Sequence, residues 1–191
     1  MLFSPLIERA LRLAGRKHHP QVRKVSDVPY FTHLAGAAIV LLRAGMHDEQ
    51  IIAAALLHDV VEDTDCELED LEGEFPPDVV AWVAVSTEQK HNTDGTKRSW
   101  EDRKQEHVSH IAAAPREARA IVLADKLHNL GSMLYDHGND PSFWDRFGAP
   151  PERLVWYYTE MVNRAASDDP ELATLAGECR TLLAQLQHRF A

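Results

Sequence analysis

The feature that most constrains the fold is the spacing of apolar residues, which recur every three or four positions along almost the whole chain. This spacing is typical of amphipathic helices, whereas strands need strict alternation and an enrichment in β-branched residues. No segment shows the strand pattern, so the sequence predicts an all-α fold. The expected helices cover residues 4–18, 32–44, 49–64, 67–74, 77–90, 100–113, 116–137, 151–167 and 171–189.

Composition places the chain among ordinary globular proteins, with 191 residues of which 45% are apolar and 26% charged. There is no internal repeat or composition shift, so we treat residues 1–191 as one domain. The formal charge of −10 offers no basic surface for a phosphate backbone, which argues against nucleic acid as a partner. No apolar run approaches the roughly 20 residues of a membrane span. Because Cys66 and Cys179 form no CxxC pair, we expect a soluble cytoplasmic protein with reduced thiols and no membrane partner.

The segment DEQIIAAALLHDVVEDT, residues 48–64, begins as an apolar helix and ends in a group of ionisable residues. At about 100° per residue, His58, Asp59, Glu62 and Asp63 gather on one side of this helix. Burying such carboxylates without partners is costly, and a bound cation would remove the cost. An exposed helix end would avoid it as well, and this segment alone does not separate the two interpretations.

Two other segments favour the cation. Asp125 lies inside the apolar segment IVLADKLHNL, where a lone carboxylate needs a partner, and His33 lies near the start of the apolar segment PYFTHLAGAAIVLL. Together with His58 and Asp59 they form a set of two imidazoles and two carboxylates. Such a set suits a divalent metal and leaves coordination positions open for water and substrate. We therefore predict a metal site between core helices.

These motifs resemble those of the HD-domain phosphohydrolases, which are named for an adjacent histidine and aspartate. The segments HHPQVRK, PYFTH, AALLHDVVEDT, STEQK and LADKLHN are similar, in the same order, to one branch of that family, the small alarmone hydrolases. The resemblance covers residues from about 5 to 165. It implies a helical fold, one divalent metal, usually manganese, and release of pyrophosphate from the ribose 3′ position of guanosine tetraphosphate and pentaphosphate.

The resemblance also implies roles for single residues. The four ligands predicted above match the family's metal ligands, and Glu62 and Asp63 match its catalytic carboxylate pair. Arg23 and Lys24 match a pair that packs near the purine base, and Asn129 matches a residue near the ribose. A bound cation would make water more acidic, and the carboxylate pair would then orient that water or transfer its proton.

Further positions follow or depart from the family pattern. Arg103 and Lys104 lie in a segment similar to one in bacterial members, where we expect them to face the substrate phosphates. Gly131 stands where an arginine is common, so a phosphate contact is expected to be missing. Pro20 replaces the usual glycine before Gln21 and is expected to reshape the loop that carries the base-binding pair.

The remaining histidines are weaker candidates. His107 and His110 lie three residues apart, which can suit a metal, but we interpret them as part of an exposed polar face. His18 and His19 either border the base pocket or belong to a solvated helix end. His128 is interpreted as a structural hydrogen-bonding histidine rather than a ligand.

Other patterns carry less functional information. Trp156, Tyr157 and Tyr158 invite a stacking role, but we interpret them as core residues. The polar segment 91–98 is a loop whose DGTKRS lacks the spacing of a phosphate-binding P-loop.

Three rival functions remain open at this point. One is hydrolysis of another nucleotide, such as the 2′-phosphate of NADPH, by the same metal and carboxylates. A second is a nucleotide sensor without turnover, against which the retention of Glu62 and Asp63 argues. A plain structural helical protein is the third, and the convergence of three segments on one ligand set argues against it.

Overall fold

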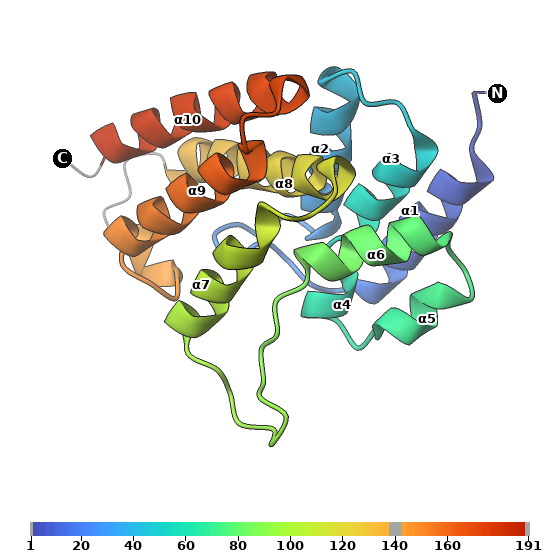
Figure 1. The fold of residues 1–191 in the computed structure, drawn as a ribbon. Coiled ribbons are helices and arrows are strands. Elements are labelled where there is room, and N and C mark those ends of the chain that lie inside the picture. Colours follow the sequence, from blue (N-terminus) through green and yellow to red (C-terminus); the bar gives the residue numbers. More distant parts are fainter. Residues whose placement is uncertain (1, 138–142, 190–191) are drawn as a thin grey trace.

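The computed structural model describes residues 2–137 and 143–189, which form a helical bundle (Figure 1). Within these residues the only β pairing is two isolated bridges, so the predicted all-α class is confirmed. The elements are α1 (Pro5–Lys17), α2 (Phe31–Arg43), α3 (Glu49–Leu57), α4 (Val60–Asp63), α5 (Leu68–Glu72), α6 (Pro77–Ser86), α7 (Trp100–Ile111), α8 (Arg116–His137), η1 (Phe143–Arg146), α9 (Pro151–Ala166), η2 (Pro170–Leu172) and α10 (Ala173–His188), where η marks a 3₁₀ turn.

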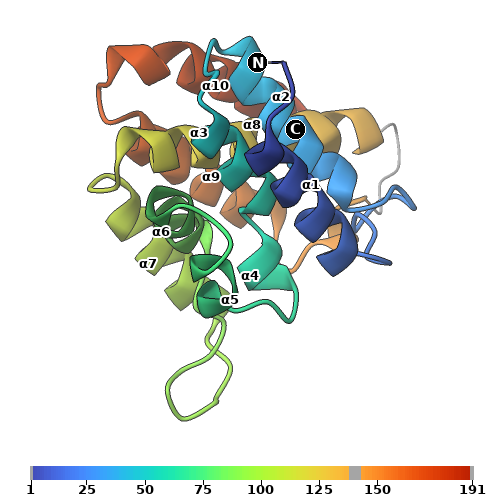
Figure 2. The same cartoon turned by 90° about the vertical axis from the view of Figure 1, so that its right-hand side faces the viewer.

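Helix α8 lies at the centre of the fold because residues 120–127 are buried on every side. It packs against α2, α3, α6, α9 and α10, while α1 covers α3 (Figures 1 and 2). A helix surrounded in this way carries any polar side chain of its middle turns into the core. Asp125 is such a side chain.

Several helix ends follow signatures that can be read in the sequence. The side chains of Ser4, Asp48 and Ser99 accept backbone N–H groups at the starts of α1, α3 and α7. Gly45 follows the end of α2 with φ +87°, a conformation that glycine adopts without steric cost.

The predicted continuous helix over residues 49–64 is wrong, because the chain breaks between α3 and α4. Residues 58 and 59 form a turn, and Asp59, with φ −102° and ψ −2°, deviates from the ideal helical values of about −63° and −42°. His58 Nδ1 donates to the Ala55 carbonyl at 2.7 Å, which stabilises the last turn of α3. The break turns the side chains of His58 and Asp59 toward α2 and α8, so the bend is tied to the cluster described below.

The predicted helix over residues 77–90 is too long, since α6 ends at Ser86. Thr87 is extended, with ψ 123°, and its hydroxyl donates to the Val83 carbonyl at 2.9 Å. The chain that follows stays against α4 at Glu88, and the loop over residues 91–98 then projects from the body of the molecule in both views (Figures 1 and 2). Among the described residues, no helix has the length and apolarity needed to cross a bilayer.

Candidate metal centre and active-site cavity

Four side chains meet between α2, the α3–α4 break and α8. His33 Nε2 lies 3.2 Å from Asp125 Oδ1 and 3.5 Å from Asp59 Oδ2. His58 Nε2 lies 3.1 Å from Asp59 Oδ2 and 3.8 Å from Asp125 Oδ1. His33, His58 and Asp125 alone place one ligand atom each within 4.8 Å of one another. Sequence segments 25 to 92 residues apart in the chain are thus brought to one point, as the sequence predicts.

The cluster has the properties of a metal site. Nε2 of His33 and of His58 are both buried and have no hydrogen-bond partner among the described residues. The proton of His58 is on Nδ1, because that atom faces the Ala55 carbonyl and must donate. Its Nε2 is therefore the ring nitrogen that faces the two carboxylates and that could bind a metal. A divalent cation would satisfy both imidazoles and both acids, so the residues fit the metal that they are predicted to hold.

His128 contacts the ring of His33 and orients it. The two Nδ1 atoms lie 2.9 Å apart, and burial, followed by the charges of His33 and Arg23, lowers the pKa of His128 to about 4. A neutral His128 accepts the proton of His33 Nδ1, which leaves His33 Nε2 free for a metal. The predicted structural role of His128 is confirmed. The ring fits only because residue 36 is glycine, since a Cβ at Gly36 would come within 2.1 Å of it.

The predicted catalytic pair lies one helical turn beyond the break, on α4. Glu62 Oε2 accepts the backbone N–H of Glu88 at 3.1 Å, and Asp63 Oδ1 accepts Lys90 Nζ at 2.6 Å. Burial, together with the charges of Glu88, Asp59 and Asp63, raises the pKa of Glu62 to about 7. A carboxyl group in this state exchanges protons near neutral pH.

Tyr30 joins this pair to the metal cluster. Its hydroxyl lies 2.6 Å from Asp59 Oδ2 and 3.2 Å from Asp63 Oδ2. Burial and the charges of Asp59 and Asp63 raise the pKa of Tyr30, so the hydroxyl stays protonated and donates. The stacked ring of His18, 4.9 Å away, holds Tyr30 in place.

A cavity of about 440 Å³ opens beside the cluster, and most of the predicted site residues line it. Every site residue predicted from the sequence lines it except His33 and His58, which lie behind the two aspartates. The wall includes the two predicted acids of α4, the two aspartates predicted to bind metal and the predicted substrate contacts Arg23, Lys24, Arg103, Lys104 and Asn129.

The predicted base-binding and ribose-binding residues are linked. Arg23 Nη2 donates to Asn129 Oδ1 at 2.6 Å, and its guanidinium lies 5.4 Å from the Tyr30 ring centre. Asn129 Nδ2 in turn donates to Asp125 Oδ1. The backbone of the loop supports Arg23, whose N–H donates to the Val28 carbonyl at 2.9 Å.

Arg103 and Lys104 lie on the opposite wall and contact one carboxylate. Arg103 Nη1 lies 3.2 Å from Glu88 Oε2, and Lys104 Nζ donates to Glu88 Oε1. Lys126 Nζ donates to Asp125 Oδ2 at 2.6 Å and faces the Tyr157 ring at 5.3 Å. Cations therefore surround the cavity although the chain as a whole is acidic.

Comparison with known proteins shows to which family this chain belongs. The HD domain profile matches residues 10–141. This chain belongs to the HD-domain family. The guanosine-3′,5′-bis(diphosphate) 3′-pyrophosphohydrolase MESH1 of Drosophila melanogaster is 38% identical over 136 residues, which are 70% of this chain and 71% of that protein. Human MESH1 is 39% identical over 126 residues, 65% of this chain and 67% of that protein.

Solved structures agree with the sequence relatives. A structure described as a metazoan ortholog of SpoT that hydrolyzes ppGpp and plays a role in starvation responses matches with a TM-score of 0.80 and 28% identity, over 97% of each chain. A GTP pyrophosphokinase of Streptomyces coelicolor is 38% identical over 129 residues, but these are only 15% of that longer protein. This HD-domain protein thus shares its fold with the first of these proteins and its sequence similarity with a short part of the second.

Three minor predictions for this HD-domain protein need correction. His107 is not part of an exposed face, since its buried ring lies 3.3 Å from the Tyr157 hydroxyl, whereas His110 is exposed. Trp156 is 40% exposed rather than core, while Tyr157 is buried. Three consecutive helical residues point about 100° apart, so they cannot all face one core. Of the two open interpretations of His18 and His19, the solvated helix end is wrong for His18, which is buried against Tyr30, but agrees with the exposure of His19.

The two departures from the family pattern have local structural consequences. After Pro20, the Gln21 carbonyl accepts the Tyr30 N–H at 2.9 Å, and the loop still brings Arg23 to the cavity. A Cβ at Gly131 would lie 3.8 Å from Leu182 of α10. Ser132 lines the cavity at the neighbouring position.

Sequence reasoning did not single out Tyr30, Glu88, Lys90 and Lys126, although all four line the cavity of this HD-domain protein. Each lies inside a motif that carries the family resemblance, two of them in STEQK. Position within a shared motif was therefore the available signal. Their partners, which come from other helices, were not visible in the sequence.

Proposed function

We propose that this HD-domain protein is a metal-dependent hydrolase that removes the 3′-pyrophosphate from guanosine tetraphosphate and pentaphosphate, the alarmones of the stringent response. The observation that carries the proposal is one cavity that opens beside a buried His and Asp cluster and is lined by a carboxylate pair and several cations. The 3′-pyrophosphohydrolase activity for which the MESH1 relatives are named supports the choice of substrate.

We propose His33, His58, Asp59 and Asp125 as the ligands of a single divalent ion, with Mn²⁺ as the native metal. Two imidazole nitrogens and two carboxylate oxygens suit a borderline divalent ion. When bound, such an ion supplies Lewis acidity, which acidifies water and screens the charge of the phosphate. Lys126 and Asn129 hold Asp125, and Tyr30 holds Asp59, so both carboxylates are fixed before metal binds.

In the proposed reaction, water attacks the phosphorus that is bonded to the ribose 3′ oxygen. The bond between this phosphorus and the 3′ oxygen breaks, and pyrophosphate leaves. Glu62 and Asp63 orient the water, accept its proton and return a proton to the 3′ oxygen. Lys90 and Tyr30 fix Asp63 for this task, and the backbone N–H of Glu88 fixes Glu62.

The remaining cavity residues bind the substrate in this proposal. Arg23 and Lys24 contact the purine base, Asn129 lies near the ribose, and Arg103 and Lys104 face phosphate groups. We propose the cytoplasm as the compartment, since the substrate is an intracellular nucleotide and both cysteines are free thiols. The partner is a small molecule, and neither nucleic acid nor membrane is required.

The test is turnover of guanosine tetraphosphate by purified protein with Mn²⁺, followed as release of guanosine diphosphate and pyrophosphate. NADPH and other nucleotides are run beside it. We expect turnover that requires a divalent ion and is fastest with the alarmone. Tight alarmone binding without turnover under any divalent ion would instead identify a sensor, and faster phosphate release from NADPH would identify the other nucleotide hydrolase.

A further inference from the structure

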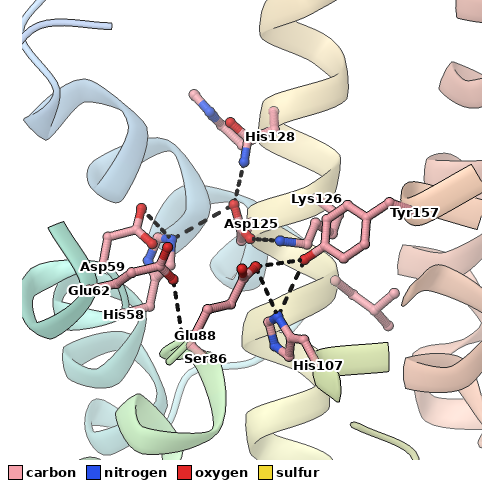
Figure 3. A network of polar contacts seen from close by, with 12 residues as sticks. His58, Asp59, Glu62, Ser86, Glu88, His107, Asp125, Lys126, His128 and Tyr157 are labelled. Carbon is pink, nitrogen blue, oxygen red and sulfur yellow. Dashed lines mark hydrogen bonds and ion pairs between the residues drawn. The ribbon is translucent and has the colours of Figure 1, made fainter. Parts of the chain in front are cut away.

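Glu88 places a single carboxylate at the meeting point of four side chains. The residue is 8% exposed, and it contacts two cations, Arg103 and Lys104, as described above. On its other side, the Tyr157 hydroxyl donates to Oε1 at 3.3 Å and His107 Nδ1 lies 3.4 Å from the same oxygen (Figure 3). Every side-chain oxygen of Glu88 is therefore engaged by protein groups.

The backbone at Glu88 reaches the predicted catalytic pair. Its N–H donates to Glu62 Oε2 at 3.1 Å, and Lys90, two residues later, donates to the Glu62 carbonyl at 2.6 Å. Figure 3 shows Glu88 between Glu62 on α4 and His107 on α7. This short extended segment thus ties the proposed chemical centre to the helix that carries Arg103 and Lys104.

The charges explain why a buried acid is needed at this position. Burial lowers the pKa of Lys104, and the charge and hydrogen bond of Glu88 act in the opposite direction. For Glu88 itself, burial opposes ionisation, but hydrogen bonds and charges from His107 and Lys104 outweigh it and hold the pKa below its usual value. A buried ammonium group beside another cation needs such a counter-charge to stay ionised.

Both cations keep donors for a ligand. A guanidinium has five N–H bonds and an ammonium three. Arg103 contacts Glu88 through Nη1, and Lys104 contacts it through one N–H of Nζ. Both side chains line the 440 Å³ cavity. The contact with Glu88 therefore fixes their direction while leaving N–H groups for the oxygens of an anion.

We propose that Glu88 is a positioning residue, which holds Arg103 and Lys104 charged and directed into the cavity for the pyrophosphate group of the substrate. This inference rests on the proposed function. Glu88 does not touch the substrate; it acts through the two cations. In the opposite role, Glu88 would compete with phosphate for these cations, and removing its charge would strengthen the binding of pyrophosphate instead of weakening it.

The decisive variant is Glu88→Gln, which keeps the size of the side chain and removes its charge. We expect KM for guanosine tetraphosphate to rise about tenfold, with a much smaller change in kcat. Calorimetry of metal-free protein with inorganic pyrophosphate should show a similar rise in Kd. Glu88→Asp keeps the charge and should recover part of both losses. Glu106→Gln is the control, because Glu106 is on the same helix as Arg103 and Lys104 but pairs with Arg98 at the surface.

An unchanged or lower KM and Kd in Glu88→Gln would overturn the inference. If that variant does not fold, Tyr157→Phe is the deciding variant, because it removes only the hydroxyl that donates to Glu88. We expect its affinity for pyrophosphate to be two- to threefold weaker. An unchanged affinity would overturn the inference. A parent protein that binds pyrophosphate through Glu88 but does not hydrolyse the alarmone would refute the proposed function alone. Alarmone hydrolysis with Glu88-independent pyrophosphate binding would refute the positioning role alone.

Discussion

At the scale of single residues, Glu62 and Asp63 separate catalysis from binding. Glu62→Gln and Asp63→Asn keep side-chain size and leave the four ligands in place, so we expect metal content and nucleotide affinity to remain. Loss of a proton-transferring group is typically worth about 10² to 10⁴ in rate, so kcat should fall within that range. Steady-state kinetics and metal analysis check this, with Glu69→Gln on the exposed side of α5 as the control. Parent-like turnover in both variants would remove the pair from the mechanism.

Arg23 and Lys24 test the proposed binding of the base. Alanine at either position should raise KM about tenfold and change kcat less, because the interaction is made equally in the ground state and the transition state. Lys97→Ala, in the exposed loop, is the matched control. If kcat and kcat/KM instead fall together while metal is retained, these residues act at the scissile phosphate rather than at the base.

At the scale of elements, the contact between α2 and α8 depends on Gly36. Gly36→Ala would place a methyl group inside the His128 ring position, and overpacking of this kind costs about 1–3 kcal/mol of unfolding free energy. Displacing His128 also frees His33, so metal affinity should fall about tenfold. Chemical denaturation and metal titration measure the two effects.

The control for this substitution is Gly177→Ala on α10, where nothing lies within 4 Å of the new methyl group. Alanine at an open helical site should stabilise the protein by roughly 0.5–1 kcal/mol. Equal behaviour of the two variants would show that the close approach of His128 to α2 does not matter.

The elements also show what a sequence can and cannot predict. Apolar periodicity was sufficient for α8, whose burial makes Asp125 a conspicuous polar residue. It failed at His58 and Asp59, because the same periodicity continues through the break, and the bend is set by partners on α2 and α8. It failed again after Ser86, where contacts of Glu88 and Lys90 with α4 hold the chain extended. The convergence of the proposed ligands was predictable from residue type and family resemblance, whereas the linking residues depend on contacts between distant segments.

At the scale of the whole molecule, a metal held by α2, the α3–α4 break and α8 should stabilise the fold. Binding only to the native state adds about 2.7 kcal/mol at a metal concentration of 100 times Kd. For a protein of this size that corresponds to a rise in Tm of roughly 5–10 °C. Thermal unfolding with Mn²⁺ and after chelation measures it. His58→Ala and Asp125→Ala should lose both bound metal and the rise in Tm, while His47→Ala, at the surface, should keep them. Stoichiometric metal in either ligand variant would contradict the assignment.

The hydrogen bonds of Asn129 couple the binding of metal to the binding of nucleotide. One side of its amide holds Arg23, and the other holds Asp125. When nucleotide orders Arg23, Asn129 becomes ordered as well, so Asp125 loses less conformational freedom when metal binds. The same holds in the opposite direction. Linkage then requires reciprocity: the factor by which nucleotide strengthens metal binding equals the factor by which metal strengthens nucleotide binding. A cell that accumulates the nucleotide would in this way load its own hydrolase with metal, even when free metal is scarce.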